Sequence, residues 1–535
     1  MLHKFYIVVD DPEHKLGLHQ ELEAVEGHET VPERPVDIVN PMPHSEYNSV
    51  AMLTQEEADT LISDLRVRDV HRDPYELGVK KGITGTRTGN WRKNTTFDTT
   101  DKNWGLVRCI STSDNFTVNY GNTTSNFTYN LNGTGVDFVI MDTGIEPNHP
   151  EFAVNADGTG GSRVVNYDWT QHGIIASTPV GGFLGDCDGH GSNCASIAAG
   201  NTNGWAPGAA IYSLRSVGTG ATTEYDITDG RQLDLLDDFE VWQTLRAWHN
   251  AKPVTSTGYK RPTVVNCSFG FFITYKDVSS ITYRGTTYSV STTTGQYGTM
   301  GVNVGVPVSG VHGFRYTALE AEITSTMNAG VIVVGAAGND SHKIDVPGGL
   351  DYDNYYYSPS RAGNYFYHRG STPSATPGVI SVGCMAAYTN NNFVGGTEHK
   401  RGFSCCGPRV DIWAPGDSIM GAYANAIYNY ASVADPRSAT MGTGYTYYLN
   451  KIDGTSQASP QVAGVVTCLL EARPWMTPTE VKNWTTSTAS TWSPIQNYYT
   501  NSPGYTYTQL SSLQGGPAKA LYQPFNNPIP LKVNG

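Results

Sequence analysis

Short apolar runs without polar alternation constrain the fold of this chain most strongly. The runs lie at 136–141, 210–215, 263–266, 330–334, 379–382 and 410–413, with helical apolar spacing at 237–249 and 318–327. Strands that are apolar on both faces and alternate with helices are typical of a mostly parallel sheet that is covered on both sides. The sequence therefore predicts an α/β fold. In such sheets the chemistry lies at the carboxyl ends of the strands.

Length and charge limit the classes of function. The chain has 535 residues, which is enough for more than one domain, and only 16% of them are charged, against about a quarter in average globular proteins. The net charge of −14 argues against a general nucleic-acid-binding surface. No apolar run approaches the roughly 18 residues that suggest a membrane span.

The cysteines and the first residues give further expectations. Eight cysteines are few for this length, and Cys405 and Cys406 are adjacent, which disfavours a simple disulfide framework. No Cys or His spacing suggests zinc. The first ten residues run into an acidic segment instead of a cleavage site, so no signal peptide is expected there. The compartment stays open, with an extracellular or virus-particle location favoured by the uncharged polar composition.

The first 75 residues are predicted to form a small α+β domain. Strands are expected at 5–9, 49–53 and 67–70, and helices at 14–25 and 58–65, the second after a capping-box-like Thr54-Gln55-Glu56-Glu57. This domain could be an independent binding module. Residues 76–103 are rich in Gly, Lys, Arg and Thr without an apolar period, so we expect an exposed linker that is open to proteolysis.

Small residues crowd around Ser456 in the stretch 453–464, Asp-Gly-Thr-Ser-Gln-Ala-Ser-Pro-Gln-Val-Ala-Gly. An apolar run at helical spacing follows, so Ser456 is predicted at the start of a buried helix. Pro460 fits a helix only near such a start, where the amides have no intrahelical partner. A hydroxyl there is accessible and close to free N–H groups, which are two needs of an acyl-transfer nucleophile. A helix-capping serine is the alternative.

Other polar residues are expected at strand ends or helix starts. Asp142 ends a buried strand, His190 begins an apolar helix between two glycines, and Asn339 follows three small residues at a strand end. Taken singly, these could be a turn aspartate, a solvated loop histidine and a turn asparagine. Asn266–Gly270 ends another strand, and its backbone could pair with an extended peptide. With Ser456, all of them can converge on one cleft, in an order known for Asp-His-Ser hydrolase triads.

The residues around these positions resemble the subtilase family. The similar segments are Asp142-Thr143-Gly144-Ile145 with His149-Pro150-Glu151-Phe152, Asp188-Gly189-His190-Gly191-Ser192-Asn193-Cys194-Ala195, Gly204-Trp205-Ala206-Pro207-Gly208-Ala209, Asn266-Cys267-Ser268-Phe269-Gly270, Ala336-Ala337-Gly338-Asn339, Val410-Asp411-Ile412-Trp413-Ala414-Pro415-Gly416 and Gly454-Thr455-Ser456-Gln457-Ala458-Ser459-Pro460. Cys194 is typical of the proteinase K branch of the family. The resemblance covers about 104–484, and the three triad segments in order make it specific.

The resemblance implies a serine endopeptidase with a subtilisin-like three-layer domain and no cofactor for catalysis. The implied roles are Asp142, His190 and Ser456 as the triad, Asn339 as an oxyanion donor, Ser268, Phe269 and Gly270 as the substrate strand, and Ala336, Ala337 and Gly338 as a pocket wall. The implied partners are a protein or peptide substrate and the chain's own propeptide as inhibitor. Structural calcium is compatible with the family but assigned to no residues here.

The same resemblance implies a domain plan. Residues 1–75 would be an inhibitory propeptide of ferredoxin-like β-α-β-β-α-β type, 76–103 a linker with the processing site, 104–484 the peptidase domain and 485–535 a C-terminal extension. The chain would then be a zymogen that processes itself. Insertions are expected near 271–315 and 340–371, the first as a hairpin beside the substrate strand.

Some positions depart from the family pattern. Asn193, Gln457 and Gln461 stand where the family usually has His, Met and His. Asp351 and Asp353, in the second insertion, could bind calcium or belong to a solvated loop.

A second hypothesis for the whole chain is a latent or structural, particle-associated protein on a subtilase scaffold. The presence of Asp142, His190, Asn339 and Ser456 argues against an inactive enzyme but not against a latent one.

Overall fold

The computed structural model describes the chain except residues 1, 25–26, 44, 73–84, 93–99, 114–121, 124–126, 180, 187, 217–235, 255–257, 291–309, 388–397, 424–431, 440, 442–443, 495–512 and 524–535. The chain divides into two compact units, 1–83 with 524–535 and 84–523. Of the helices that the structure describes, none has the length and apolar character needed to cross a bilayer.

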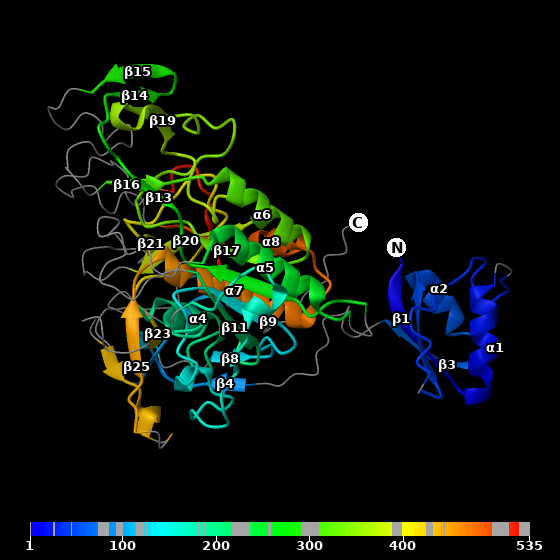
Figure 1. Cartoon of the computed structure of the whole chain (residues 1–535). Coiled ribbons are helices and arrows are strands. Elements are labelled where there is room, and N and C mark those ends of the chain that lie inside the picture. The colour runs from blue at the N-terminus through cyan, green and yellow to red at the C-terminus, as the bar shows by residue number, and fades with distance from the viewer. Residues whose placement is uncertain are drawn as a thin grey trace. The chain divides into compact units, whose positions relative to one another are not determined.

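The first unit is a small α+β domain (Figure 1). Its elements are β1 (His3–Val9), α1 (Pro12–Glu23), β2 (Asn48–Leu53), α2 (Gln55–Leu61) and β3 (Val67–Arg72). The antiparallel sheet has the order β2-β1-β3, and leucines of both helices pack on it. The predicted capping box begins α2, because Thr54 and Glu57 bond each other's backbone N–H groups. The described residues of this unit form three strands, so a fourth strand of a ferredoxin-like domain is not among them.

The second unit is built on a large, mostly parallel sheet. The strand order is β10-β11-β9-β12-β17-β20-β22-β27-β26, with β21 paired to β20. The strands are β9 (Asp137–Asp142), β10 (Val164–Val165), β11 (Ala210–Arg215), β12 (Thr263–Cys267), β17 (Ile332–Ala336), β20 (Ile380–Ala387), β21 (Glu398–Lys400), β22 (Ile412–Pro415), β26 (Ser490–Thr491) and β27 (Lys519–Ala520). The predicted α/β architecture is therefore present.

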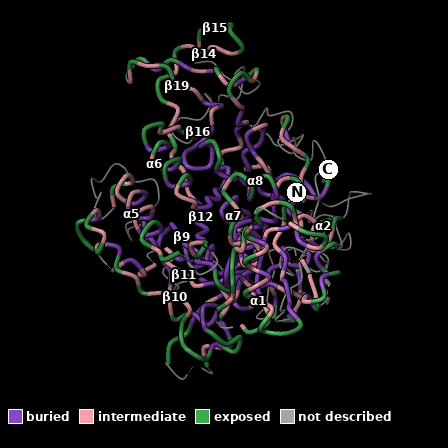
Figure 2. The backbone as a smooth tube through the Cα atoms, turned by 90° about the vertical axis from the view of Figure 1, so that its right-hand side faces the viewer, coloured by how far each residue is buried: buried purple, intermediate pink, exposed green. Residues whose placement is uncertain are grey.

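Helices cover this sheet on both faces. They are α3 (Trp104–Arg108), α4 (His190–Ala199), α5 (Asp238–Ala251), α6 (Thr317–Asn328), α7 (Thr455–Ala472) and α8 (Pro478–Thr488). Helices α5 and α6 pack with alternate strand residues such as Val139, Met141 and Val333. Helices α4 and α7 pack together, and α7 lies along four central strands, with every residue from Thr455 to Leu470 buried. The tube view shows this buried interior (Figure 2).

The two predicted insertions form one small sheet, in the order β15-β14-β18-β19. Strands β14 (Ser280–Tyr283) and β15 (Thr286–Ser289) come from the first insertion, whereas β18 (Tyr355–Ser358) and β19 (Gly363–Phe366) come from the second. Strands β13 (Phe272–Thr274) and β16 (Val311–Gly313) pair separately, next to the predicted substrate strand. Three further strands, β23 (Ile419–Tyr423), β24 (Ser432–Ala434) and β25 (Tyr448–Ile452), form a sheet against α4.

The prediction of an exposed linker over 76–103 is wrong for its described part. Strand β4 (Gly85–Arg87) pairs with β8 (Phe127–Tyr129), and β5 (Asn90–Arg92) pairs with β6 (Asp101–Lys102) and β7 (Asn122–Thr123). Trp91 is fully buried at 0% exposure, and the Arg87 guanidinium lies 4.9 Å from the ring centre of Tyr129. Strands of two or three residues are too short to show an apolar period, so the sequence pattern could not reveal them.

Candidate active site

Three neighbouring strands end at one edge of the large sheet. Strand β12 lies between β9 and β17, and its last residue, Cys267, is in register with Met141 and Gly335. The side chain of Asp142, the segment after β12 and the segment after β17 therefore meet at the carboxyl edge. This is the place where the chemistry of a parallel sheet is expected.

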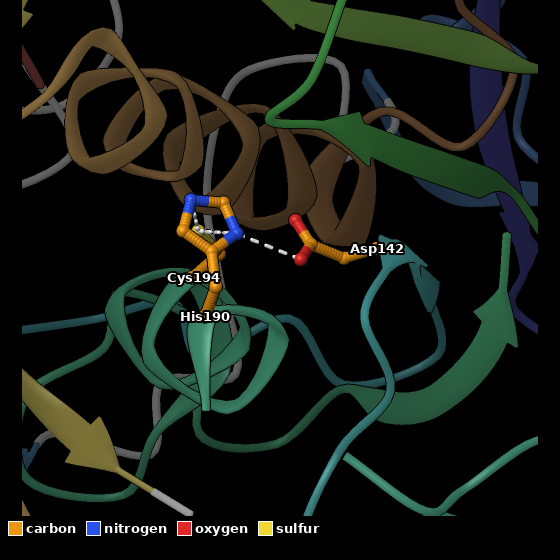
Figure 3. Close-up of side chains that lie close together, drawn as sticks. All are labelled: Asp142, His190 and Cys194. Carbon is orange, nitrogen blue, oxygen red and sulfur yellow. Dashed lines mark hydrogen bonds and ion pairs between the residues drawn. The ribbon is translucent and has the colours of Figure 1, made fainter. Parts of the chain in front are cut away.

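Asp142 and His190 form a hydrogen-bonded pair (Figure 3). Nδ1 of His190 lies 2.7 Å from Oδ1 of Asp142, which also accepts the backbone N–H of Thr143 at 2.8 Å. The carboxylate is almost fully buried, with 1% of the side chain exposed, whereas the imidazole is 26% exposed. Such a carboxylate fixes the imidazole tautomer with the proton on Nδ1, which leaves Nε2 available as a base.

Burial and charge act on His190 in opposite directions. Burial lowers the pKa of the imidazole, but the negative charge of Asp142 and its hydrogen bond outweigh it, so the pKa lies well above the usual 6.5. Burial raises the pKa of the neighbouring Cys194 thiol. The thiol is therefore neutral at neutral pH, and Asp142 supplies the local negative charge.

Asp186 holds the start of α4, and the sequence reasoning missed it. Its carboxylate accepts the N–H groups of Gly189 and Ser192, each at 2.8 Å, and the hydroxyl of Thr143 at 2.8 Å. Acceptors at a helix N-terminus satisfy amides that have no intrahelical partner. The helix of His190 is thus tied to the loop of Asp142. The signal in the sequence that could have identified Asp186 is its position shortly before the predicted start of the helix.

Ser456 lies in the first turn of α7, as predicted, but Pro460 is deeper in the helix than expected. The helix begins at Thr455, which places Pro460 in its second turn. Proline has no N–H, so the carbonyl of Ser456, four residues earlier, loses its intrahelical donor. The Ser268 hydroxyl at 2.9 Å and the Cys194 thiol at 3.3 Å donate to this carbonyl instead. The proline thereby leaves a carbonyl of α7 free to accept from α4 and from the segment directly after β12.

The hydroxyl of Ser456 donates to the carbonyl of Ser268 at 3.0 Å. Among the described contacts, none joins it to His190. Sγ of Cys194 lies 3.9 Å from each ring nitrogen of His190 and 3.3 Å from the Ser456 carbonyl, so His190 and Ser456 flank one side chain. The hydroxyl has to rotate away from Ser268 before it can reach the imidazole.

Asn339 lies beside the start of α7. Its Oδ1 accepts the Thr455 backbone N–H at 3.0 Å and the Thr455 hydroxyl at 2.8 Å. Because the oxygen is held in this way, the Nδ2 group points away from the helix cap. No partner is described for the backbone N–H of Ser456. The site therefore offers two N–H donors near the hydroxyl.

The predicted substrate-binding residues form two backbone segments at the same edge. Phe269 packs against the large core and is partly buried. At Gly270, an added Cβ would lie 2.4 Å from Oγ of Ser371, so a side chain does not fit. Ala336, Ala337 and Gly338 are buried small residues at the end of β17 and directly after it. Gly338 has φ +115, which L-residues with a side chain rarely adopt.

Two positions in the described part of the chain carry side chains of types that can bind metal ions. Asp142, His190 and Cys194 offer ligand atoms that lie within 4.8 Å of one another. Metal ligation needs a thiolate, whereas burial raises the pKa of this thiol, and the Asp142–His190 bond already occupies both facing atoms. The carboxylate of Asp351 is occupied by Arg284 and Lys343, each at 2.7 Å, which argues against the calcium alternative there.

Comparisons with known proteins agree on one family. The model described as the subtilase family matches residues 133–516. The chain is 27% identical to the extracellular serine proteinase of Thermus sp. (strain Rt41A), over 65% of this chain and 54% of that protein. It is 23% identical to alkaline serine exoprotease A of Vibrio alginolyticus, over 84% of this chain and 56% of that protein. The chain spans about half the length of these relatives.

Solved structures give a weaker likeness. The crystal structure of a cold adapted subtilisin-like serine proteinase aligns with 20% identity and a TM-score of 0.43. The alignment covers 79% of this chain and 98% of that one.

Proposed function

The chain belongs to the subtilase family, and on that premise we propose that it is a serine endopeptidase that uses Asp142, His190 and Ser456 as its triad. The hydrogen bond of 2.7 Å between Asp142 and His190, with Cys194 touching both His190 and the Ser456 carbonyl, carries the proposal. This arrangement supports His190 as a base whose tautomer is fixed and Ser456 as a nucleophile that is separated from it by the side chain of Cys194.

In the proposed reaction, Oγ of Ser456 leaves the Ser268 carbonyl and attacks a peptide carbonyl carbon. Nε2 of His190 takes the hydroxyl proton and then gives it to the leaving amine. Asp142 holds the imidazole and stabilises the imidazolium. Water then attacks the carbonyl carbon of the acyl-enzyme while His190 takes its proton. The bond to Oγ of Ser456 breaks, His190 returns the proton to this oxygen, and the carboxylic acid product leaves. The chain's own groups suffice for these steps, so we propose no cofactor.

The oxyanion and the substrate have proposed positions too. Nδ2 of Asn339 and the Ser456 backbone N–H would donate to the oxyanion, and one such donor contributes about 3 kcal/mol. An extended peptide would add as a strand to Ser268–Gly270, with Ala336–Gly338 as the opposite wall. When Ser456 rotates, the Ser268 carbonyl becomes free to accept a backbone N–H of the substrate. Substrate binding and nucleophile release are thereby linked.

The proposal fixes the direction of a pH dependence. His190 accepts a proton only when it is neutral, and its pKa lies well above the usual 6.5. Activity should therefore be low at weakly acidic pH and rise through an acid limb centred above pH 6.5. We would measure kcat/KM on a peptide substrate from about pH 5 to about pH 10, because this ratio reports the free enzyme. An acid limb centred below the usual histidine pKa of 6.5 would contradict the role of Asp142.

We further propose that the first unit is a ferredoxin-like inhibitory propeptide, that the protein is made as a zymogen and cuts itself, and that the peptidase unit lies in the proteinase K branch. The two separate compact units and the strand pattern of the first one support the propeptide, and Cys194 next to His190 supports the branch. Because β4, β5 and β6 pair within the second unit, we expect them to remain with the peptidase after the cut.

Intact mass of the purified protein beside a Ser456→Ala variant tests self-processing. We expect the wild type to lose an N-terminal piece and the variant to keep it. Equal trimming of both proteins would mean that another protease makes the cut. Full length for both would contradict self-processing and favour a latent protein.

A further inference from the structure

We propose that Asn193 and Gln457 form a positioning pair, which sets the helix of His190 against the nucleophile and its oxyanion donors. The inference rests on the proposed function and concerns the same site. Asn193 is three residues after His190 on α4, and Gln457 directly follows Ser456 on α7. Both positions depart from the family pattern, and the structure brings the two departures into contact.

The side-chain amides of Asn193 and Gln457 are hydrogen-bonded to each other in the protein interior. Nε2 of Gln457 donates to Oδ1 of Asn193 at 3.1 Å, and Nδ2 of Asn193 donates to the backbone carbonyl of Ala422 in β23 at 3.3 Å. Asn193 is 0% exposed and Gln457 is 1% exposed. A buried amide that loses its partner is costly, because no water replaces the bond. The spacing of α4 and α7 is therefore fixed close to the two reacting side chains.

The backbone of β23 also fixes which atom of Gln457 faces the site. The carbonyl of Ala422 can only accept, so Nδ2 of Asn193 must face it and Oδ1 must face Gln457. Gln457 then has to present Nε2 to Asn193, which turns Oε1 in the other direction. This orientation follows from the hydrogen-bond chain, since the two ends of an amide have nearly the same shape.

Oε1 of Gln457 lies at the oxyanion side of the site. It is a buried atom without a hydrogen-bond partner among the described residues. An ideal Cβ on Gly454 would lie 2.6 Å from Oε1, 3.4 Å from the Ser456 backbone nitrogen and 3.5 Å from Nδ2 of Asn339. One acceptor and both proposed oxyanion donors thus surround one point over Gly454. The Asn193–Gln457 bond therefore fixes a side chain that lines this point beside the two proposed donors.

Gln461 provides a matched control, one turn further along α7. It is buried too, and its Nε2 donates to Oδ1 of Asn103 at 2.9 Å. Its Oε1 accepts from Nδ2 of Asn103 at 3.1 Å and from the indole of Trp205 at 2.7 Å. Replacing Gln457 or Gln461 with Met removes a buried amide from the same helix. Only the first replacement removes an atom that faces the oxyanion donors.

The test compares Gln457→Met and Gln461→Met in the full chain, each measured for thermal unfolding, kcat and KM on one peptide amide substrate. Both variants should be less stable than wild type. Gln457→Met should lose about tenfold to a hundredfold in kcat with KM changed less than about threefold, because the pair positions groups that act in the transition state. Gln461→Met should keep kcat within about threefold. The double variant Asn193→Ala/Gln457→Met should lose less kcat than the product of the fold-losses of the two single variants, because the two residues act as one pair.

A second variant pair keeps the test decisive if Gln457→Met does not fold. Gln457→Asn is too short to reach Asn193 and should lose kcat, and Asn193→Gln in the same chain restores the combined length and should recover part of it. Equal kcat in Gln457→Met and Gln461→Met, or no recovery in the length-swapped double variant, would overturn the positioning role. A wild type without peptidase activity would instead overturn the proposed function itself.

Discussion

Ser456→Ala is expected to abolish peptide hydrolysis, with a fall in kcat of about a millionfold. The variant keeps the proposed oxyanion donors and the substrate strand but has no atom that can form the acyl-enzyme. The residual rate should stay above that of water alone, because binding and the oxyanion donors still act. Substrate affinity should not fall, since the lost hydroxyl bonds the Ser268 carbonyl in the free protein and its loss leaves that carbonyl open to the substrate. Peptide cleavage and binding of a product peptide measure both effects.

Ser459→Ala is the control for this loss. Ser459 is a buried serine on the same helix, and its hydroxyl donates to Oδ1 of Asn266 at 2.8 Å, away from His190. We expect the control to keep activity within a few-fold and to lose some stability. If Ser456→Ala kept more than about a hundredth of the wild-type rate, Ser456 could not be the nucleophile.

Asp142→Asn is expected to lower kcat by about ten-thousandfold while the protein stays folded. An asparagine of the same shape can present its Nδ2 to the imidazole, which places the histidine proton on the nitrogen that should act as base. It also removes the charge that raises the pKa of His190, so any residual acid limb should move to lower pH. Steady-state kinetics and circular dichroism check the activity and the fold.

Asp168→Asn serves as the matched control for the aspartate change. Asp168 is exposed and caps the short helix Trp169–His172, so its loss should leave kcat within about twofold. Near-full activity in Asp142→Asn would show that His190 works without this carboxylate. The proposed triad would then be wrong even if Ser456 proved essential.

The sequence predicted the large sheet and the convergence of the site because both depend on local patterns. Buried parallel strands are apolar on both faces, and Asp142, His190, Asn339 and Ser456 each stand next to glycine or other small residues at an element end. Strand β9 is observed at Asp137–Asp142 against a predicted 136–141, and α5 at Asp238–Ala251 against 237–249. Such residues are constrained by turn geometry and by the close approach of backbones, both of which leave marks in the sequence.

Contacts between distant segments left no such marks. The joining of β14 and β18 into one sheet, and the pairing of β4 with β8, connect stretches whose own sequences have no clear period. The bond of Ser456 to the Ser268 carbonyl depends on a side-chain rotation that no motif specifies. The matching of Asn193 with Gln457 joins residues 264 positions apart. A single sequence shows each departure but not the contact between them.

Labelling by a serine-reactive phosphonate tests the central claim most directly. The wild-type protein would be incubated with the probe, digested and mapped by mass spectrometry, with Ser456→Ala and Asp142→Asn treated alike. The account predicts one adduct on Ser456 in the wild type, much slower labelling in Asp142→Asn and none in Ser456→Ala. An adduct on another serine, or none on a folded wild-type protein from which the first unit has been removed, would contradict it.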